Sequence, residues 1–100
     1  MLGRPVKHRI VHKDPDTKQF SPRGTRGRPG YNKLKVEELE AIRLIDHMGL
    51  KQIEASEAMG ISQQTFSRIL RNARKAIAEA LVLGHIIKVV GGVFKIEKWA

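Results

Sequence analysis

Hydrophobic residues in the central and C-terminal parts of the chain recur every three or four positions, the spacing that places side chains on one face of a helix. Each periodic stretch is followed by a glycine, which ends a helix readily because it takes the left-handed conformation without a Cβ clash. The pattern predicts a mainly α fold with three helices, over Leu34–Met48, from Lys51 or Gln52 to Met59, and over Gln63–Leu83.

The junction between the second and third predicted helices carries the most specific pattern. Gly60 ends the second helix, and the Ser62 hydroxyl is suited to accept from the free backbone N–H groups of the third. Ser56 is small enough to let two helices cross closely before the turn. This arrangement is typical of a helix-turn-helix, whose second helix enters the DNA major groove. A plain helical hairpin that binds no nucleic acid has the same spacing.

Polar residues on the third predicted helix favour DNA binding. Hydrogen-bonding side chains fill its first two turns, and Gln and Arg are the types that contact adenine and guanine edges. We expect bases to be read by Ser62, Gln63, Gln64, Thr65, Ser67 and Arg68, and phosphates to be bound by Arg71, Arg74 and Lys75. The predicted buried stripe is Phe66, Ile69, Leu70, Ala73, Ile77, Ala80 and Leu81. The alternative is a solvated helix face, although most such faces mix charges.

The two ends of the chain have different patterns from the middle. The N-terminal end is rich in glycine, proline and basic residues, and predicts one short strand over residues 6–12 and a loop over residues 20–31, pinned by Phe20 or Tyr31. The C-terminal end predicts two strands joined by a Gly-Gly turn. The expected parts are an N-terminal arm (residues 1–33), a helix-turn-helix domain (34–84) and a C-terminal β-hairpin (85–100).

An isolated hairpin of this length is only marginally stable in water. The predicted C-terminal strands must therefore pack on the helices, pair with the N-terminal strand, or pair with another subunit. Their exposed β-branched residues make a homodimer one of the expected assemblies.

The net charge of +9 is concentrated near the N-terminus. Residues 1–35 contain ten of the 19 Lys and Arg residues but only two of the ten Asp and Glu residues, which suits a polyanionic partner. We expect phosphate contacts from Arg4, Lys7, Arg9, Arg23, Arg26 and Arg28. The run Arg26-Gly27-Arg28-Pro29 resembles short motifs that lie in AT-rich minor grooves. Ordinary phosphate contact and a solvated, solubilising tail are the alternatives.

Several classes of chemistry lack the residues they need. The absence of cysteine fits a reducing compartment and excludes a thiolate zinc site. His8 and His12 on one strand would be ~13 Å apart, too far to share a metal ion, so we expect two surface histidines. Glu37, Glu38 and Glu40 resemble a solvated helix start rather than a catalytic pair. We therefore expect no enzyme, metal or cofactor and, because no apolar run approaches the ~20 residues that span a bilayer, a cytoplasmic protein.

Two resemblances extend these expectations. Val36–Leu81 is similar to region four of bacterial sigma factors, which binds the promoter −35 element, through LEAIRL at 39–44, MGIS at 59–62 and ARK at 73–75. The chain up to Gly92 resembles a prokaryotic family of small uncharacterised proteins predicted to bind DNA through a sigma-like helix-turn-helix. The shared motifs are GRP at 3–5, FSPRG at 20–24, EAIRL at 40–44, EA at 54–55, GIS at 60–62, TF at 65–66, RIL at 68–70 and GG at 91–92, together with Gln52.

Three residues depart from the family pattern. Ile53 stands where an acid is usual, Ser56 where alanine is usual, and Gln63 where arginine is frequent. Since Gln63 is an expected base-reading residue, its base preference would differ from that of relatives.

The resemblance implies double-stranded DNA as the partner and a role in transcription regulation. Because sigma region four also docks on RNA polymerase, a protein-interaction module that binds the polymerase is one alternative. Non-specific DNA or RNA binding by the arm is another. Structured RNA is bound by stacking on aromatic side chains, and the arm offers only Phe20 and Tyr31.

Overall fold

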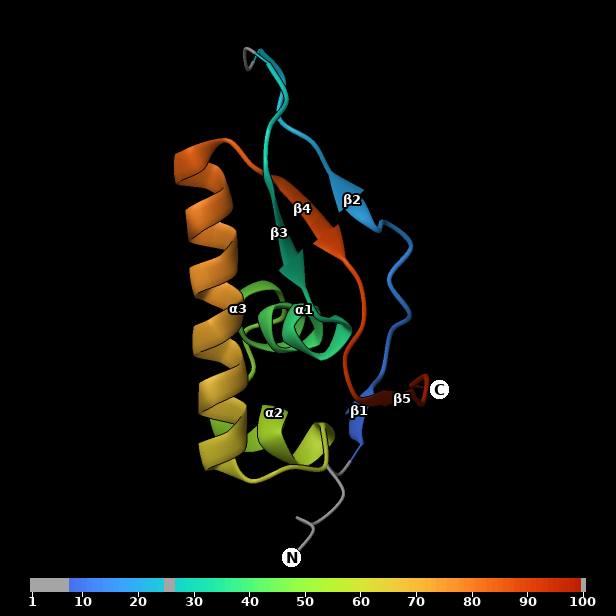
Figure 1. Ribbon diagram of the computed structural model, residues 1–100. Helices are drawn as coiled ribbons and strands as arrows, with labels where there is room; N and C mark the ends of the chain where they lie inside the picture. Colours follow the sequence, from blue (N-terminus) through green and yellow to red (C-terminus); the bar gives the residue numbers. More distant parts are fainter. Residues whose placement is uncertain (1–7, 25–26, 100) are drawn as a thin grey trace, which may run out of the picture.

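The computed structural model describes residues 8–24 and 27–99 (Figure 1). Its helical elements are α1 (Val36–Ile42), the π-helical turn η1 (Arg43–His47), α2 (Gln52–Ala58) and α3 (Gln63–Leu83). Its strands are β1 (Arg9–Val11), β2 (Gln19–Phe20), β3 (Tyr31–Leu34), β4 (Ile86–Val89) and β5 (Phe94–Ile96). None of the helices within these described ranges is both long and apolar enough to cross a membrane.

The three predicted helices are present, but the first differs in two ways. It begins at Val36 rather than Leu34 because the preceding residues form β3, and the Glu38 carboxylate accepts the Lys35 backbone N–H at 2.8 Å. It then widens into η1, in which Met48 N–H donates to the carbonyl of Arg43, five residues back, at 2.9 Å. Single π-helical turns of this kind often occur at functional sites.

The predicted C-terminal β-hairpin is wrong. β4 lies between β2, to which it is antiparallel, and β3, to which it is parallel, whereas β5 pairs in parallel with β1. The segment between β4 and β5 crosses α1 instead of turning back, since Val90 N–H donates to the Leu34 carbonyl and Val36 N–H donates to the Gly91 carbonyl. Of the expected ways to stabilise these strands, the structure contains two: packing on the helices and pairing with strands of the N-terminal segment.

A glycine is required where this crossing passes α1. Gly92 has a φ of +109°, and a Cβ added there would overlap the Glu37 carboxylate. The other oxygen of that carboxylate accepts the Val93 backbone N–H at 3.1 Å. The crossing is therefore fastened to α1 by a buried acid, an interaction that a hairpin pattern does not encode.

The N-terminal segment is also paired more extensively than predicted. Residues 19–20 and 31–34 form β2 and β3 where loop or helix was expected, while β1 confirms part of the predicted strand over residues 6–12. Phe20 and Tyr31 are each about half exposed, but both lie in strands paired with β4, so they join the ends of the intervening loop to the globular part as predicted. The expectations for Arg4, Lys7 and Arg26 fall outside the described residues.

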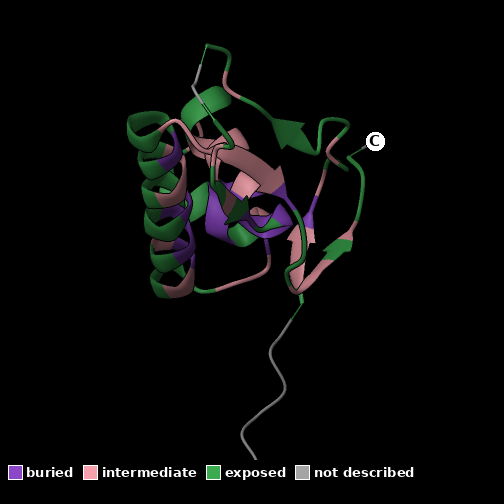
Figure 2. Cartoon of the chain, turned by 45° about the horizontal axis from the view of Figure 1, so that its top comes forward, coloured by how far each residue is buried: buried purple, intermediate pink, exposed green. Residues whose placement is uncertain are grey.

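The core has two parts that meet along α3, whose inner side is buried along most of its length (Figure 2). One lies among the helices and consists of Ala41, Leu44, Ala55, Met59, Phe66, Ile69 and Leu70. The other lies between α3, α1 and the strands and consists of Val11, Leu34, Val36, Ala73 and Val89. The predicted burial of Leu81 is wrong, because Leu81 is 75% exposed, and Ile53, which is apolar where the family usually has an acid, is 48% exposed. Leu81 lies in the last turn of α3, and Ile53 lies on the outer side of α2.

The acids of α1 are buried, which corrects the expectation of a solvated helix start. Glu37, Glu38 and Glu40 are 5%, 9% and 2% exposed. Glu37 and Glu40 each accept a backbone N–H from a segment packed on α1, and Glu38 accepts one from the residue that precedes the helix. Glu40 also forms a two-pronged ion pair with Arg43, at 2.7 and 3.0 Å. These acids therefore join the helix to the chain around it.

Candidate nucleic-acid interface

The start of α3 is held by the predicted turn and cap. Gly60 has a φ of +67°, and Ile61 N–H donates to the Ser56 carbonyl at 3.1 Å. The Ser62 hydroxyl oxygen accepts the Thr65 backbone N–H at 3.1 Å, which confirms Ser62 as the N-cap. The same hydroxyl donates to Thr65 Oγ1 at 3.0 Å, so the Thr65 hydroxyl proton is left to bind a partner.

Strand β1 packs directly beneath this turn. Ile10 N–H donates to the Met59 carbonyl at 3.0 Å, and the Ile10 side chain lies 3.2 Å from where a Cβ on Gly60 would stand. A larger residue at the turn would therefore push β1 away. The consequence is that Arg9, predicted as a phosphate contact of the arm, lies beside the first turns of α3.

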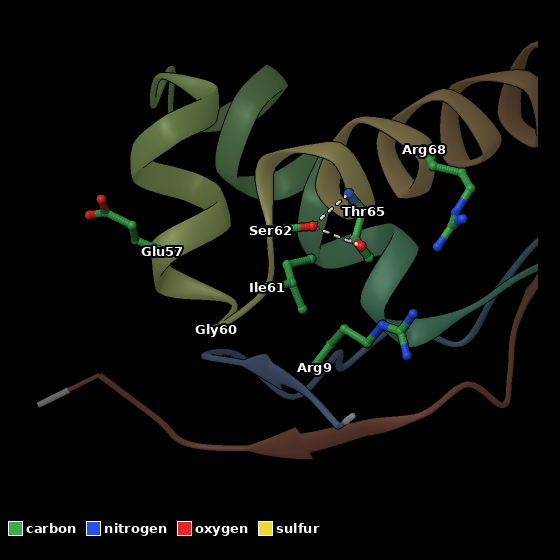
Figure 3. A pocket seen from close by; sticks show the side chains of 7 residues that line it. All are labelled: Arg9, Glu57, Gly60, Ile61, Ser62, Thr65 and Arg68. Atoms are coloured by element: carbon green, nitrogen blue, oxygen red, sulfur yellow. Dashed lines mark hydrogen bonds between the residues drawn. The ribbon is translucent and has the colours of Figure 1, made fainter. Parts of the chain in front are cut away.

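An open hollow of about 550 Å³ lies between β1 and the start of α3 (Figure 3). It is lined by Arg9, Glu57, Gly60, Ile61, Ser62, Thr65 and Arg68. In Figure 3, Arg9 and Arg68 carry their guanidinium groups on the same side of the hollow, while the Glu57 carboxylate points away from it. Two cations, two hydroxyl groups and a helix N-terminus suit an anion such as a phosphate.

The outer face of α3 continues from this hollow along the helix. Gln64, Arg68, Arg71 and Lys75 are all exposed, and their three- and four-residue spacing places them in one line. Gln63 is exposed at the start of the helix. Partly buried Ser67 donates to the Gln52 side-chain oxygen at 2.9 Å, so it links α3 to α2 as well as facing outward.

Arg74 lies beside this line and is already paired. Its guanidinium donates to both carboxylate oxygens of Asp46, in η1, at 2.7 and 3.2 Å. The hydrogen bonds from Arg74 lower the pKa of Asp46, and those to Asp46 raise the pKa of Arg74. A phosphate contact by Arg74 would therefore compete with this pair.

The three predicted phosphate contacts of the arm that the structure describes are not gathered in one place. Arg9 lies at the start of α3, whereas exposed Arg23 and Arg28 belong to the loop between β2 and β3. That loop lies near the other end of α3, because Tyr31 pairs with Ile86 just after the helix ends (Figure 1). The structure thus joins Arg9 to the expected base-reading residues and separates the loop arginines from them.

His12 is not the surface histidine that the sequence predicted. Its two ring nitrogens lie 2.7 Å from the carbonyl oxygens of Glu97 and Ala58, and its ring stacks on Trp99 at 4.4 Å. It therefore connects β1, the C-terminal segment and the end of α2. Among the described residues there is no group of three or more His, Cys, Asp or Glu side chains that could hold a metal ion.

Comparison with known proteins places the chain among proteins whose activity has not been assigned. Residues 1–97 match the family model described as "Protein of unknown function DUF134". A UPF0251 protein of Methanococcus maripaludis strain C7 is 42% identical over 97 residues, which are 96% of this chain and 75% of that protein. UPF0251 proteins of Desulforudis audaxviator and Caldicellulosiruptor saccharolyticus are 47% and 49% identical, over 94% and 91% of this chain and 62% and 64% of theirs. No solved structure matches. The chain belongs to the DUF134 (UPF0251) family of uncharacterised prokaryotic proteins.

Proposed function

We propose that this protein is a sequence-specific, double-stranded DNA-binding regulator of transcription. In this proposal α2, the turn at Gly60 and α3 act as a helix-turn-helix, with α3 as the recognition helix. The resemblance of this part of the sequence to sigma region four points the same way.

One observation supports the proposal above all others. The outer face of α3 from Gln63 to Ala78 contains no acid, and its Gln64, Arg68, Arg71 and Lys75 side chains are exposed in one line. A major groove admits one α-helix, whose early residues contact base edges and whose later cations lie along phosphates. A face of one charge sign on an otherwise well-buried helix suits that geometry.

The hollow beside α3 adds a phosphate contact from a second element. Arg9 reaches the start of α3 from β1, next to the hydroxyls of Ser62 and Thr65. A DNA phosphate in this position would fix the helix in register, which base contacts alone do not do. Arg68 belongs both to the lining of this hollow and to the exposed line on α3, so it is the residue whose role most needs a direct test.

The test is anisotropy titration of labelled duplex DNA across a series of salt concentrations. The upstream region of the protein's own gene is compared with a scrambled duplex and with duplex RNA. A preference of ~10³ or more that persists near physiological salt supports a specific regulator. Equal and steeply salt-dependent binding to all three would leave only non-specific contact by the basic surface, and no binding at low salt would reject the proposal.

Arg68→Ala separates base reading from phosphate binding. If Arg68 contacts guanine, the substitution costs about 1–3 kcal/mol on the preferred duplex and flattens specificity at one position. If it contacts phosphate, affinity falls equally for all duplexes. Lys18→Ala is the matched control, because it removes one exposed cation from the segment before β2, which does not line the hollow at the start of α3.

A protein partner is a second candidate, favoured by a different feature. Leu81, Val82 and Leu83 in the last turn of α3 are 75%, 83% and 58% exposed. Three adjacent exposed apolar residues suit contact with another protein, such as RNA polymerase or a second copy of this chain. A stable complex with polymerase in the absence of DNA would favour this candidate.

A further inference from the structure

We propose that a second hollow, apart from the one at the start of α3, binds a small aromatic carboxylate. It is lined by residues of α1, η1 and β2 and of the segment that joins β1 to β2. It is separate from the surface proposed to bind DNA, and this inference does not depend on that proposal.

The inner part of the hollow is apolar. It has a volume of about 320 Å³ and is lined mainly by Pro15, Phe20, Val36, Leu39 and Ile42, with Lys13, Asp16, Thr17, Glu40, Arg43 and His47 at its edges. A cavity of about 150 Å³ lined by apolar side chains accommodates benzene, so this volume suits two fused rings. Volumes above about 300 Å³ are typical of small-molecule sites.

The outer part combines charged side chains of both signs with aromatic rings. An adjoining hollow of about 440 Å³ shares Lys13, Asp16 and Arg43 with the first and adds His12, Asp14, Lys98 and Trp99. Arg43 lies 5.3 Å from the centre of the Trp99 ring, whose other contact is the stacked ring of His12. An apolar interior that opens between cations and an aromatic ring fits a ligand with an apolar body and an acidic end.

The charges of this opening favour a ligand with no more than one negative charge. Among the residues that line the two hollows, the cations are Lys13, Arg43 and Lys98 and the carboxylates are Asp14, Asp16 and Glu40, so the two signs balance. An anion must therefore replace one of the existing carboxylate contacts or use donors that these contacts leave over. A dianion such as a phosphate monoester would remain partly uncompensated beside three carboxylates.

Two of the cations have capacity for a ligand. Among the described residues, Lys13 forms an ion pair with Asp16, at 3.5 Å and with both side chains exposed, so a ligand carboxylate can replace that weak contact. Arg43 places two donors on Glu40 and one on the sulfur of Met48, which leaves two of its five N–H groups. Arg43 is also the first residue of η1, and a widened turn at the edge of a hollow is a recurrent feature of binding sites.

The test uses 2-naphthoate and the one tryptophan of the chain, whose indole N–H gives one resonance in an ¹H–¹⁵N spectrum. Saturable displacement of the Trp99 resonance is expected, with a Kd of about 1 mM or below for a ligand of this size. Acetate tests the acidic end alone, and 2-naphthamide tests the rings without the charge. Acetate and 2-naphthamide are each expected to bind at least about fivefold more weakly than 2-naphthoate.

Two exposed positions allow variants that keep the fold. Lys13→Gln should weaken 2-naphthoate severalfold and leave 2-naphthamide unchanged, whereas Phe20→Ala should weaken both. Lys33→Gln is the matched control, because Lys33 is an exposed lysine of β3 that lines neither hollow. The proposal is overturned if 2-naphthoate causes no saturable change, if the amide or acetate binds equally well, or if neither Lys13→Gln nor Phe20→Ala changes the affinity.

Discussion

The two ends of α3 differ sharply in what surrounds them. At its start, Phe66, Ile69 and Leu70 are buried on one side while glutamines and arginines are exposed on the other. In its last turn, Ala80 is buried but the three apolar residues after it are exposed. The first end belongs to a core shared with α1 and α2, whereas the last turn extends along β3 and β4, which cover only one side of it.

This difference teaches that hydrophobic periodicity alone does not say how much of a helix is buried. The same three- and four-residue spacing continues to the end of α3, yet the elements available to cover it do not. The buried start is rigidly placed and can position side chains for recognition. In the last turn of the helix, apolar side chains stay exposed among the described residues.

The largest expected effect comes from deleting a side chain at the buried end. Phe66→Ala should reduce the free energy of unfolding by about 3–5 kcal/mol, because Phe66 is fully buried and its removal leaves a cavity. Leu81→Ala should change it by less than about 0.5 kcal/mol. Urea denaturation followed by circular dichroism measures both. Similar losses for the two variants would mean that Leu81 is covered in solution, for example by a second copy.

The residues that cap the two ends of α3, Ser62 at its start and Gly84 at its end, provide a closer comparison. Ser62→Ala should cost about 1 kcal/mol, since the first turn loses the acceptor for Thr65 N–H. Gly84→Ala should cost about 1–2 kcal/mol, because Gly84 has a φ of +67°. Thermal unfolding with and without DNA distinguishes the two variants. Both should unfold at a lower temperature, but only Ser62→Ala should also weaken the proposed DNA binding. Equal effects on DNA affinity would contradict the assignment of recognition to the start of the helix.

Substitutions at the two ends of α3 should differ in their effect on the salt dependence of DNA affinity. Arg71→Ala should make the slope of log affinity against log salt shallower by about one, because one phosphate contact is lost. Leu83→Ala should leave this slope unchanged. The measurement is the anisotropy titration already described. An unchanged slope for Arg71→Ala would remove this residue from the interface.

The smallest expected effect concerns the ion pair between Arg74, in the middle of α3, and Asp46, in η1. Because hydrogen bonds from Arg74 lower the pKa of folded Asp46, the pair stabilises the protein above the unfolded pKa of about 3.9. That contribution is lost as the pH falls through the lower folded pKa. Since both side chains are about half exposed, Asp46→Asn should cost only about 0.2–1 kcal/mol at pH 7. Denaturation midpoints at pH 7 and pH 2 measure this, and a difference that persists at pH 2 would contradict the electrostatic explanation.

The elements that sequence reasoning predicted well depend on local interactions. The three helices, the turn at Gly60 and the Ser62 cap each involve residues within a few positions of one another. The strand pairing was missed because it joins distant segments: a Gly-Gly step between two alternating runs usually signals a hairpin, but here each run has a different partner. No local pattern records which of two acceptable partners a strand will take.

The candidate site also divides into features set by local sequence and features set by contacts between distant segments. The exposed line on α3 follows from helical spacing and was predicted in full. The position of Arg9 beside Ser62 and Arg68 was not, because it depends on β1 packing beneath the turn. The buried acids of α1 were misjudged for a related reason, since a carboxylate at the start of a helix is usually solvated unless another segment supplies its donors.

The parallel pairing of β1 with β5 also sets the order of events during synthesis. Arg9 is made before all the helices and the other strands of the described fold, whereas its partner Phe94 is made after all the helices and β4. At ribosomal rates of about 5–20 residues per second, β1 exists for roughly 4–17 s before β5 does. During that interval its backbone edge is open to other chains. The yield of folded protein in a cell will therefore depend on whatever shields this first strand until the last one is made.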